Sequence, residues 1–128
     1  MQAISSEKVC YVILRTREFD AKEASPYDDA GGNPTDDNDH QVLADHPDDT
    51  VYEELMTFLE ALSEDELVEL HAMVMLGRGD VDADGWADAV AVARDDLDEN
   101  TPRLMLQNPL ISDHLAEALA QFGGSCAD

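Results

Sequence analysis

The chain has 128 residues, of which 44% are hydrophobic, and this size and composition predict a single folded domain over residues 1–128. Seven Lys and Arg residues stand against thirty Asp and Glu residues, which gives a formal net charge of −23. A field of this sign repels phosphate backbones and anionic membranes, so it argues against nucleic-acid or membrane binding and favours a basic protein partner. An acidic, lysine-poor surface equally suits a salty environment and general solubility, in which case the charge has no specific role.

Residues 5–21 predict the first helix. Val9, Val12, Ile13 and Phe19 roughly share one face of a helix, and Glu, Lys, Arg and Ala flank the apolar run at 9–14. The run alone is also compatible with a buried strand. The absence of an evident partner strand favours the helix.

The two cysteines lie in different settings. Cys10 belongs to the apolar run and is typical of a small buried hydrophobic residue, whereas Cys126 lies in a Gly-Gly-Ser tail and is expected to be exposed. Cysteines so placed predict neither a disulfide framework nor a zinc site. Because the apolar run is shorter than a signal-peptide core and no segment is long enough to span a membrane, we expect a cytoplasmic location.

Residues 22–49 predict a long, flexible acidic loop. They contain prolines, glycines and scattered aspartates, and they lack apolar periodicity. His40 and His46 lie among these aspartates and are candidates for loose binding of a divalent metal, although a flexible loop would not hold fixed ligand geometry.

Residues 50–122 predict a helical body with short connections. Thr50 with Glu53, and Ser63 with Glu66, are capping-box signatures that each precede an amphipathic segment. We expect Gly77 to end the second of these helices in the left-handed conformation.

The rest of the body predicts three more helices. One has Trp86 on its apolar face, and Thr-Pro at 101–102 and Asn-Pro at 108–109 signal the starts of the other two. The methionines at core spacings favour packing, although a Met-rich groove for a partner helix is conceivable; they are Met56, Met73, Met75 and Met105.

The segment 80–85 is similar to the first half of an EF-hand calcium loop. Asp80, Asp82 and Asp84 alternate before a glycine, and Asp88 falls on the ninth position. The twelfth position is Ala91, where such a loop needs a bidentate glutamate. Calcium binding is therefore one hypothesis, and the other is that Asp82 or Asp84 caps the next helix.

Arg78 lies in the glycine-flanked turn before that segment. A guanidinium there could clamp a carboxylate or phosphate, but pairing with a nearby acid or capping helix carbonyls is favoured. An enzymatic site would combine Arg78, Asp80 and His71, yet the chain has no nucleophile motif, phosphate loop or His-Glu-x-x-His. His71 and His114 lie beside apolar helical faces and are expected at the edge of the core.

Several motifs carry a family resemblance. They are Leu-Ser-Glu-Asp-Glu at 62–66, Leu-Gly-Arg-Gly-Asp at 76–80, Trp86, Pro-Leu at 109–110, Asp113 and Leu115, with Cys10, Arg-Glu-Phe-Asp at 17–20 and Gly-Asn-Pro at 32–34 upstream. Through them the stretch 50–119 resembles a bacterial family catalogued as domain of unknown function 3775. The resemblance implies a helical bacterial protein, but it does not point to any particular activity. Any site shared with the family would involve Arg78, Asp80 and Trp86.

Together these patterns predict an all-α fold, a compact bundle of about five helices with a long acidic loop after the first. The leading functional hypothesis is a non-enzymatic interaction or regulatory module that binds a basic protein partner. One alternative is a divalent-metal-binding protein that uses Asp80, Asp82, Asp84 and Asp88. A second is an enzyme with a site around Arg78 and Asp80. The sequence does not indicate an oligomeric state.

Overall fold

The computed structural model describes residues 2–23 and 50–126, which form six α-helices and one short 3-10 turn, with no strand among them. The predicted all-α fold is confirmed. Each of the six segments predicted as helical forms an α-helix, although the predicted total was about five. The acidic loop predicted at 22–49 lies outside the described residues from position 24 onward.

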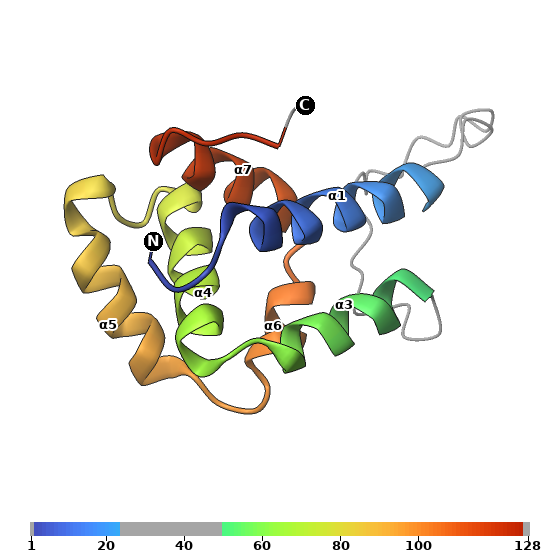
Figure 1. Cartoon of the computed structure of the whole chain (residues 1–128), viewed down its shortest axis with the longest axis horizontal. Helices are drawn as coiled ribbons and strands as arrows, with labels where there is room; N and C mark the ends of the chain where they lie inside the picture. Colours follow the sequence, from blue (N-terminus) through green and yellow to red (C-terminus); the bar gives the residue numbers. More distant parts are fainter. Residues whose placement is uncertain (1, 24–49, 127–128) are drawn as a thin grey trace, which may run out of the picture.

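Two long helices form one side of the molecule. α1 (Ser6–Glu23) confirms the helix predicted at 5–21, and it packs against α7 and α3. α3 (Thr50–Ala61) runs beside it and buries Val51, Leu55 and Leu59, which recur every four residues along one face. Both helices are therefore amphipathic and lie over a shared core (Figure 1).

α4 (Glu64–Arg78) is the central helix, since it contacts α5 on one side and α7 on the other (Figure 1). The predicted capping box at its start is confirmed. Ser63 Oγ accepts a hydrogen bond from the Glu66 backbone N–H at 3.1 Å, and Glu66 Oε1 accepts one from the Ser63 N–H at 2.9 Å. These bonds satisfy two amides that the first turn would otherwise leave unpaired.

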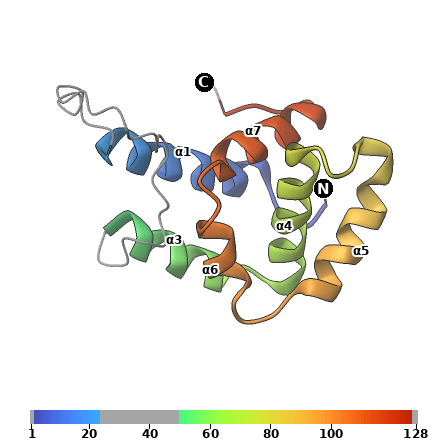
Figure 2. The same cartoon turned by 180° about the vertical axis from the view of Figure 1, so that it is seen from behind.

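The remaining helices complete the bundle. η2 (Ala83–Gly85) leads into α5 (Trp86–Asp96), whose Ala89 and Ala93 pack on Val68 and Ala72 of α4. α6 (Thr101–Leu106) and α7 (Ile111–Gln121) follow within one to three residues of the predicted starts. Seen from behind, α6 lies between α3 and α4 (Figure 2).

The buried residues of the main core come from all of the α-helices except α5, which touches this core through the partly buried Trp86. The buried residues of α5 pack on α4 in a separate small-residue contact. The largest side chains that are fully buried are Phe19, Ile13, Leu55, Leu59, Leu70, Met73, Leu76, Leu106, Ile111, Leu115 and Leu119. Met73 and Met105 are buried and Met56 and Met75 partly so, which agrees with the packing role predicted for the methionines.

The prediction that Gly77 ends α4 is wrong, because Gly77 lies inside the helix and Gly79 adopts the left-handed conformation, with φ of 92°. A Cβ atom at Gly77 would lie 1.7 Å from the carbonyl oxygen of His114. Glycine is therefore required at 77 so that α4 and α7 can touch backbone to backbone. The helix ends two residues later in a Schellman motif, with hydrogen bonds from Gly79 N to Leu76 O and from Asp80 N to Met75 O.

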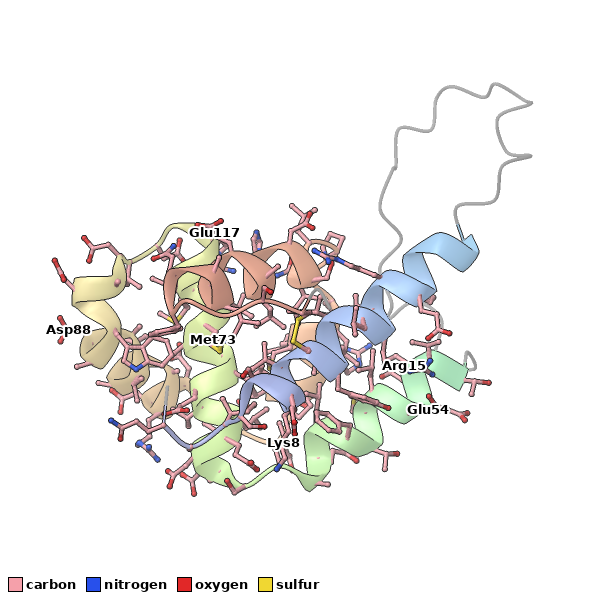
Figure 3. All side chains as sticks on the ribbon, turned by 45° about the horizontal axis from the view of Figure 1, so that its top comes forward. Lys8, Arg15, Glu54, Met73, Asp88 and Glu117 are labelled. Atoms are coloured by element: carbon pink, nitrogen blue, oxygen red, sulfur yellow. A yellow bond between two sulfur atoms is a disulfide. The ribbon has the colours of Figure 1, made fainter. Side chains whose placement is uncertain are left out.

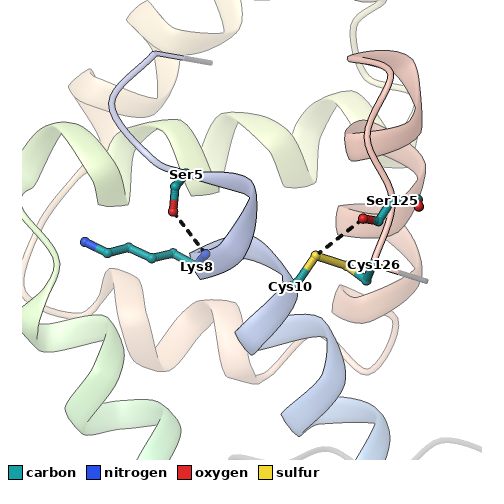
Figure 4. Close-up of a disulfide and its surroundings, with 5 residues drawn as sticks. All are labelled: Ser5, Lys8, Cys10, Ser125 and Cys126. Carbon is teal, nitrogen blue, oxygen red and sulfur yellow. Dashed lines mark hydrogen bonds between the residues drawn. A yellow bond between two sulfur atoms is a disulfide. The ribbon is translucent and has the colours of Figure 1, made fainter. Parts of the chain in front are cut away.

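The prediction for the cysteines is also wrong, because Cys10 and Cys126 form a disulfide across a sequence separation of 116 (Figure 4). Their Cα atoms lie 5.5 Å apart, within the usual range for a disulfide. α1 packs along α7, and the left-handed Gly123 (φ 84°) turns the chain back after α7. The tail thus reaches α1, and Cys126 becomes half-buried instead of exposed.

The backbone amides of the N-terminal segment converge on one buried side chain. Glu69 of α4 accepts hydrogen bonds from the backbone N–H groups of Gln2, Ala3 and Ile4, at 2.8 to 3.0 Å. Burial of a carboxylate is unfavourable unless such donors compensate for the lost water. Glu69 therefore fixes the segment that precedes α1.

Candidate functional site

The turn after α4 contains the residues predicted to be functional, and it is closed by an internal ion pair. The Schellman geometry places Asp80 two residues beyond Arg78 on the same side of the turn. The guanidinium Nε and Nη2 both donate to Asp80 Oδ2, at 2.9 and 2.7 Å. Pairing of Arg78 with a nearby acid is thus confirmed, in a half-exposed setting where such a pair contributes little to stability.

The aspartates of the calcium-like segment do not converge on one point. Asp82 accepts a hydrogen bond from the Gly85 backbone N–H at 3.1 Å and caps η2, as one of the two hypotheses predicted. Within residues 2–23 and 50–126, no group of three or more His, Cys, Asp or Glu side chains is arranged to hold a metal ion. Calcium binding through Asp80, Asp82, Asp84 and Asp88 stays a prediction without a preformed ligand set.

An open hollow of about 980 Å³ lies between this turn and α7. Its described lining combines an apolar floor with five carboxylates; the lining residues are Leu76, Gly77, Gly79, Asp80, Val81, Asp82, Gly85, Asp88, Asp113, His114, Glu117 and Gln121. We call it the acidic hollow. No Lys or Arg is among these lining residues. The close backbone contact between α4 and α7 at Gly77 brings the carboxylates of residues 80–88 near those of α7.

The carboxylates of the acidic hollow differ in how far they are neutralised. Asp80 is paired with Arg78, and Asp113 lies 3.7 Å from a guanidinium nitrogen of Arg17. Asp88 and Glu117 project from α5 and α7 into solvent (Figure 3), and within the described residues neither forms an ion pair. The hollow can therefore attract cationic groups, and its described lining contains no Ser, Thr, Cys or Lys side chain.

Trp86, the third residue singled out from the sequence, has a structural contact. Its ring packs edge to face against Phe122, with centroids 5.0 Å apart and planes at 81°. Trp86 begins α5 and Phe122 follows α7, so the pair ties the two walls of the acidic hollow to each other.

His71 lies in a different cavity, of about 410 Å³, which also has Arg78 and Asp96 in its lining. Burial lowers the pKa of His71 below its ordinary value of 6.5, Asp96 acts in the opposite direction, and Arg78 lowers the pKa further. Asp80 lines the acidic hollow instead, so two of the three residues of the enzymatic hypothesis share a cavity. Thr101 supplies the hydroxyl in this cavity, and its Oγ1 accepts a hydrogen bond from the Asp98 backbone N–H at 3.0 Å. The enzymatic hypothesis stays a prediction.

Sequence reasoning missed two features that shape the surface. Glu69 stands between Val68 and Leu70 in α4, and a carboxylate flanked by core residues was a signal for a buried acceptor. The Cys10–Cys126 bond had no local signal, because the two residues lie 116 positions apart.

Comparison with known proteins found a match to one protein family. A family model described as "Protein of unknown function (DUF3775)" matches residues 52–123, more than half of the chain. No curated protein and no solved structure matches. In the part of the chain that the structure describes, no helix is long and apolar enough to cross a membrane.

Proposed function

Because the chain belongs to the DUF3775 family of proteins of unknown function, we propose its role from its own geometry: a non-enzymatic interaction module whose acidic hollow binds a basic segment of a partner protein. The observation that supports this proposal is the lining of the hollow, in which five carboxylates surround an apolar floor and the described lining residues include no Lys or Arg. Complementary charge of this kind speeds and orients association.

The shape of the hollow favours a peptide segment over a single ion. An opening of about 980 Å³ is much larger than an ion, and its carboxylates stand around it without a common centre. Lysine and arginine have long aliphatic stems that can cover apolar surface such as that of Val81 while their charged ends meet carboxylates. A bacterial, cytoplasmic setting is part of the proposal.

The test is a pull-down from native lysate with the tagged chain, followed by affinity measurements on the partner it captures. Binding is measured at about 0.1 M and about 1 M salt, between which the Debye length falls from about 10 Å to about 3 Å. We expect capture of a basic protein at low salt and its loss at high salt. Binding that does not respond to salt contradicts the electrostatic part of the proposal.

Two double variants of equal net charge locate the surface. Asp88→Asn with Glu117→Gln removes two charges from the acidic hollow, and Glu60→Gln with Glu99→Gln removes two exposed charges elsewhere. The first variant should weaken binding by about 3- to 10-fold, as expected for the loss of two exposed ion pairs, and the second should have a much smaller effect. Equal weakening by both would show that overall charge, and not the hollow, attracts the partner.

A further inference from the structure

The C-terminal tail, residues 123–126, lies across the surface between α1 and α7 (Figure 4). The N–H groups of Gly123 and Gly124 bond back to Ala120 and Leu119, and these bonds complete the end of α7. Beyond Gly124, the described tail is anchored mainly by the disulfide bond between Cys126 and Cys10. Cys10 Sγ also lies 4.0 Å from the Ser125 carbonyl oxygen, a simple contact because a disulfide sulfur carries no proton to donate.

The surface beside the tail is mostly apolar and includes a cavity. A cavity of about 350 Å³ is lined there by Ile13 and Leu14 of α1, by Ala116, Leu119 and Ala120 of α7, by Arg17, and by the tail itself. Gly124 lies close against Leu119, and Cys126 packs on the core. Gly124 and Ser125 carry no large apolar side chain, so they add little packing energy of their own. The side chains of α1 and α7 named here form what we call the strap groove.

We propose that the Cys10–Cys126 disulfide is a redox-operated latch. In the oxidised protein the disulfide holds the tail over the strap groove, and in the reduced protein the tail leaves and the groove is exposed. The proposal follows from the combination of a covalent bond at the end of the tail, small side chains at 124 and 125, and buried apolar side chains, Ile13 and Leu119, in the wall against which the tail lies. The helices on both sides of the groove retain their own packing, because α1 and α7 contact each other directly.

The chemistry is thiol–disulfide exchange with a dithiol reductant. A thiolate of the reductant attacks one sulfur of the Cys10–Cys126 bond, forms a mixed disulfide and releases the other cysteine as a thiolate, which takes up a proton. The second thiol of the reductant then attacks the mixed disulfide. The protein gains two electrons and two protons and ends with two thiols, and the reductant ends as a disulfide.

The test is NMR of the full chain, oxidised and then reduced with dithiothreitol. On reduction the order parameters of Ser125 and Cys126 should fall from about 0.85 to below about 0.6. Methyl groups of Ile13 and Leu119, which are buried in the oxidised protein, should become accessible to a soluble paramagnetic probe. The methyl groups of Ala72 and Ala93, in the separate contact between α4 and α5, should not change.

Two variants test whether the disulfide itself holds the tail. Cys126→Ser should show the open state with or without reductant, and Ser125→Ala, which keeps both cysteines, should behave like the unmodified chain. An unchanged tail on reduction would mean that packing alone holds it. General loss of the amide spectrum on reduction, or in Cys126→Ser, would mean that the bond holds the whole fold together, and either result overturns the proposal.

Discussion

Glu69 illustrates how one residue can fix a chain terminus. Its two carboxylate oxygens receive four backbone hydrogen bonds from residues 2–4, and its exposed fraction is only 9%. An amide in its place would present an N–H₂ group toward an N–H donor, and one of the two groups would remain unpaired.

We therefore expect Glu69→Gln to lower the free energy of unfolding by about 1–3 kcal/mol, the usual range for leaving a buried polar group unsatisfied. Hydrogen exchange at the amides of Gln2, Ala3 and Ile4 should speed up in the same variant. Urea unfolding measures the first effect, with Glu60→Gln, an exposed site, as the control. Unchanged exchange at the three amides would contradict the role assigned to Glu69.

His71 makes stability depend on pH. Burial lowers its pKa in the folded state, so below its ordinary pKa of 6.5 the unfolded chain binds more protons than the folded one. The folded state is therefore penalised as pH falls from 6.5 through the lowered pKa, and it carries no such penalty above 6.5.

Protonation of the many carboxylates affects stability in the same experiment, so the comparison needs a variant. We expect His71→Gln to lose less stability than the unmodified chain between about pH 7.5 and about pH 5.5, because glutamine does not titrate. Urea unfolding at both pH values gives the difference. A difference that does not change with pH would show that His71 is not buried as the structure has it.

Among the elements, the contact between α4 and α7 depends on Gly77. In an exposed helix Gly→Ala stabilises by about 1 kcal/mol, but here the added Cβ would meet the His114 backbone at 1.7 Å. We expect Gly77→Ala to destabilise by about 3 kcal/mol or more, since the helices must move apart.

The control is Gly85→Ala, where the nearest atoms lie 3.6 Å from the new Cβ and the change should stay below about 1 kcal/mol. Chemical denaturation of both variants gives the values. A stabilised Gly77→Ala protein would mean that α4 and α7 do not touch at this point.

Local signals predicted the helices well, and they failed where a distant segment decides the outcome. The Ser63 capping box involves residues three apart, so the sequence contains all of it. The choice between Gly77 and Gly79 as the end of α4 depends on α7, some 35 residues onward, and no local pattern contains that information. The role of Glu69 could not be predicted for the same reason, because the backbone N–H groups that it binds lie more than 60 residues away.

The candidate site was predictable in its parts and not in its assembly. The turn at 78–80 and the cap at Asp82 follow from short sequence patterns. The acidic hollow also needs Asp113 and Glu117, which α7 brings to the turn only through its packing on α4. Composition indicated the sign of the surface charge, but only the packing of helices shows where carboxylates gather.

At the scale of the whole molecule, the disulfide closes nearly the full length of the chain. Cross-linking a loop of about 100 residues or more lowers the entropy of the unfolded state enough to contribute about 5 kcal/mol. Reduction should lower the free energy of unfolding by roughly this amount and still leave a folded protein if the total lies in the upper part of the usual range of about 5–15 kcal/mol.

Urea unfolding of the oxidised and reduced chain measures this contribution. The double variant Cys10→Ser with Cys126→Ser should match the reduced protein and show no response to reductant. Equal stability of the oxidised and reduced chains would indicate that the unfolded state is already compact enough to bring the two cysteines together.

The same bond makes residues 10–126 a closed covalent ring. A protease that cuts once between Cys10 and Cys126 opens the ring without dividing the molecule, because the two pieces remain joined through sulfur. Such a nicked protein runs as one species until it is reduced, and only then do two fragments separate. Cleavage and loss of mass are therefore two separate events for this chain, and the second requires a reductant.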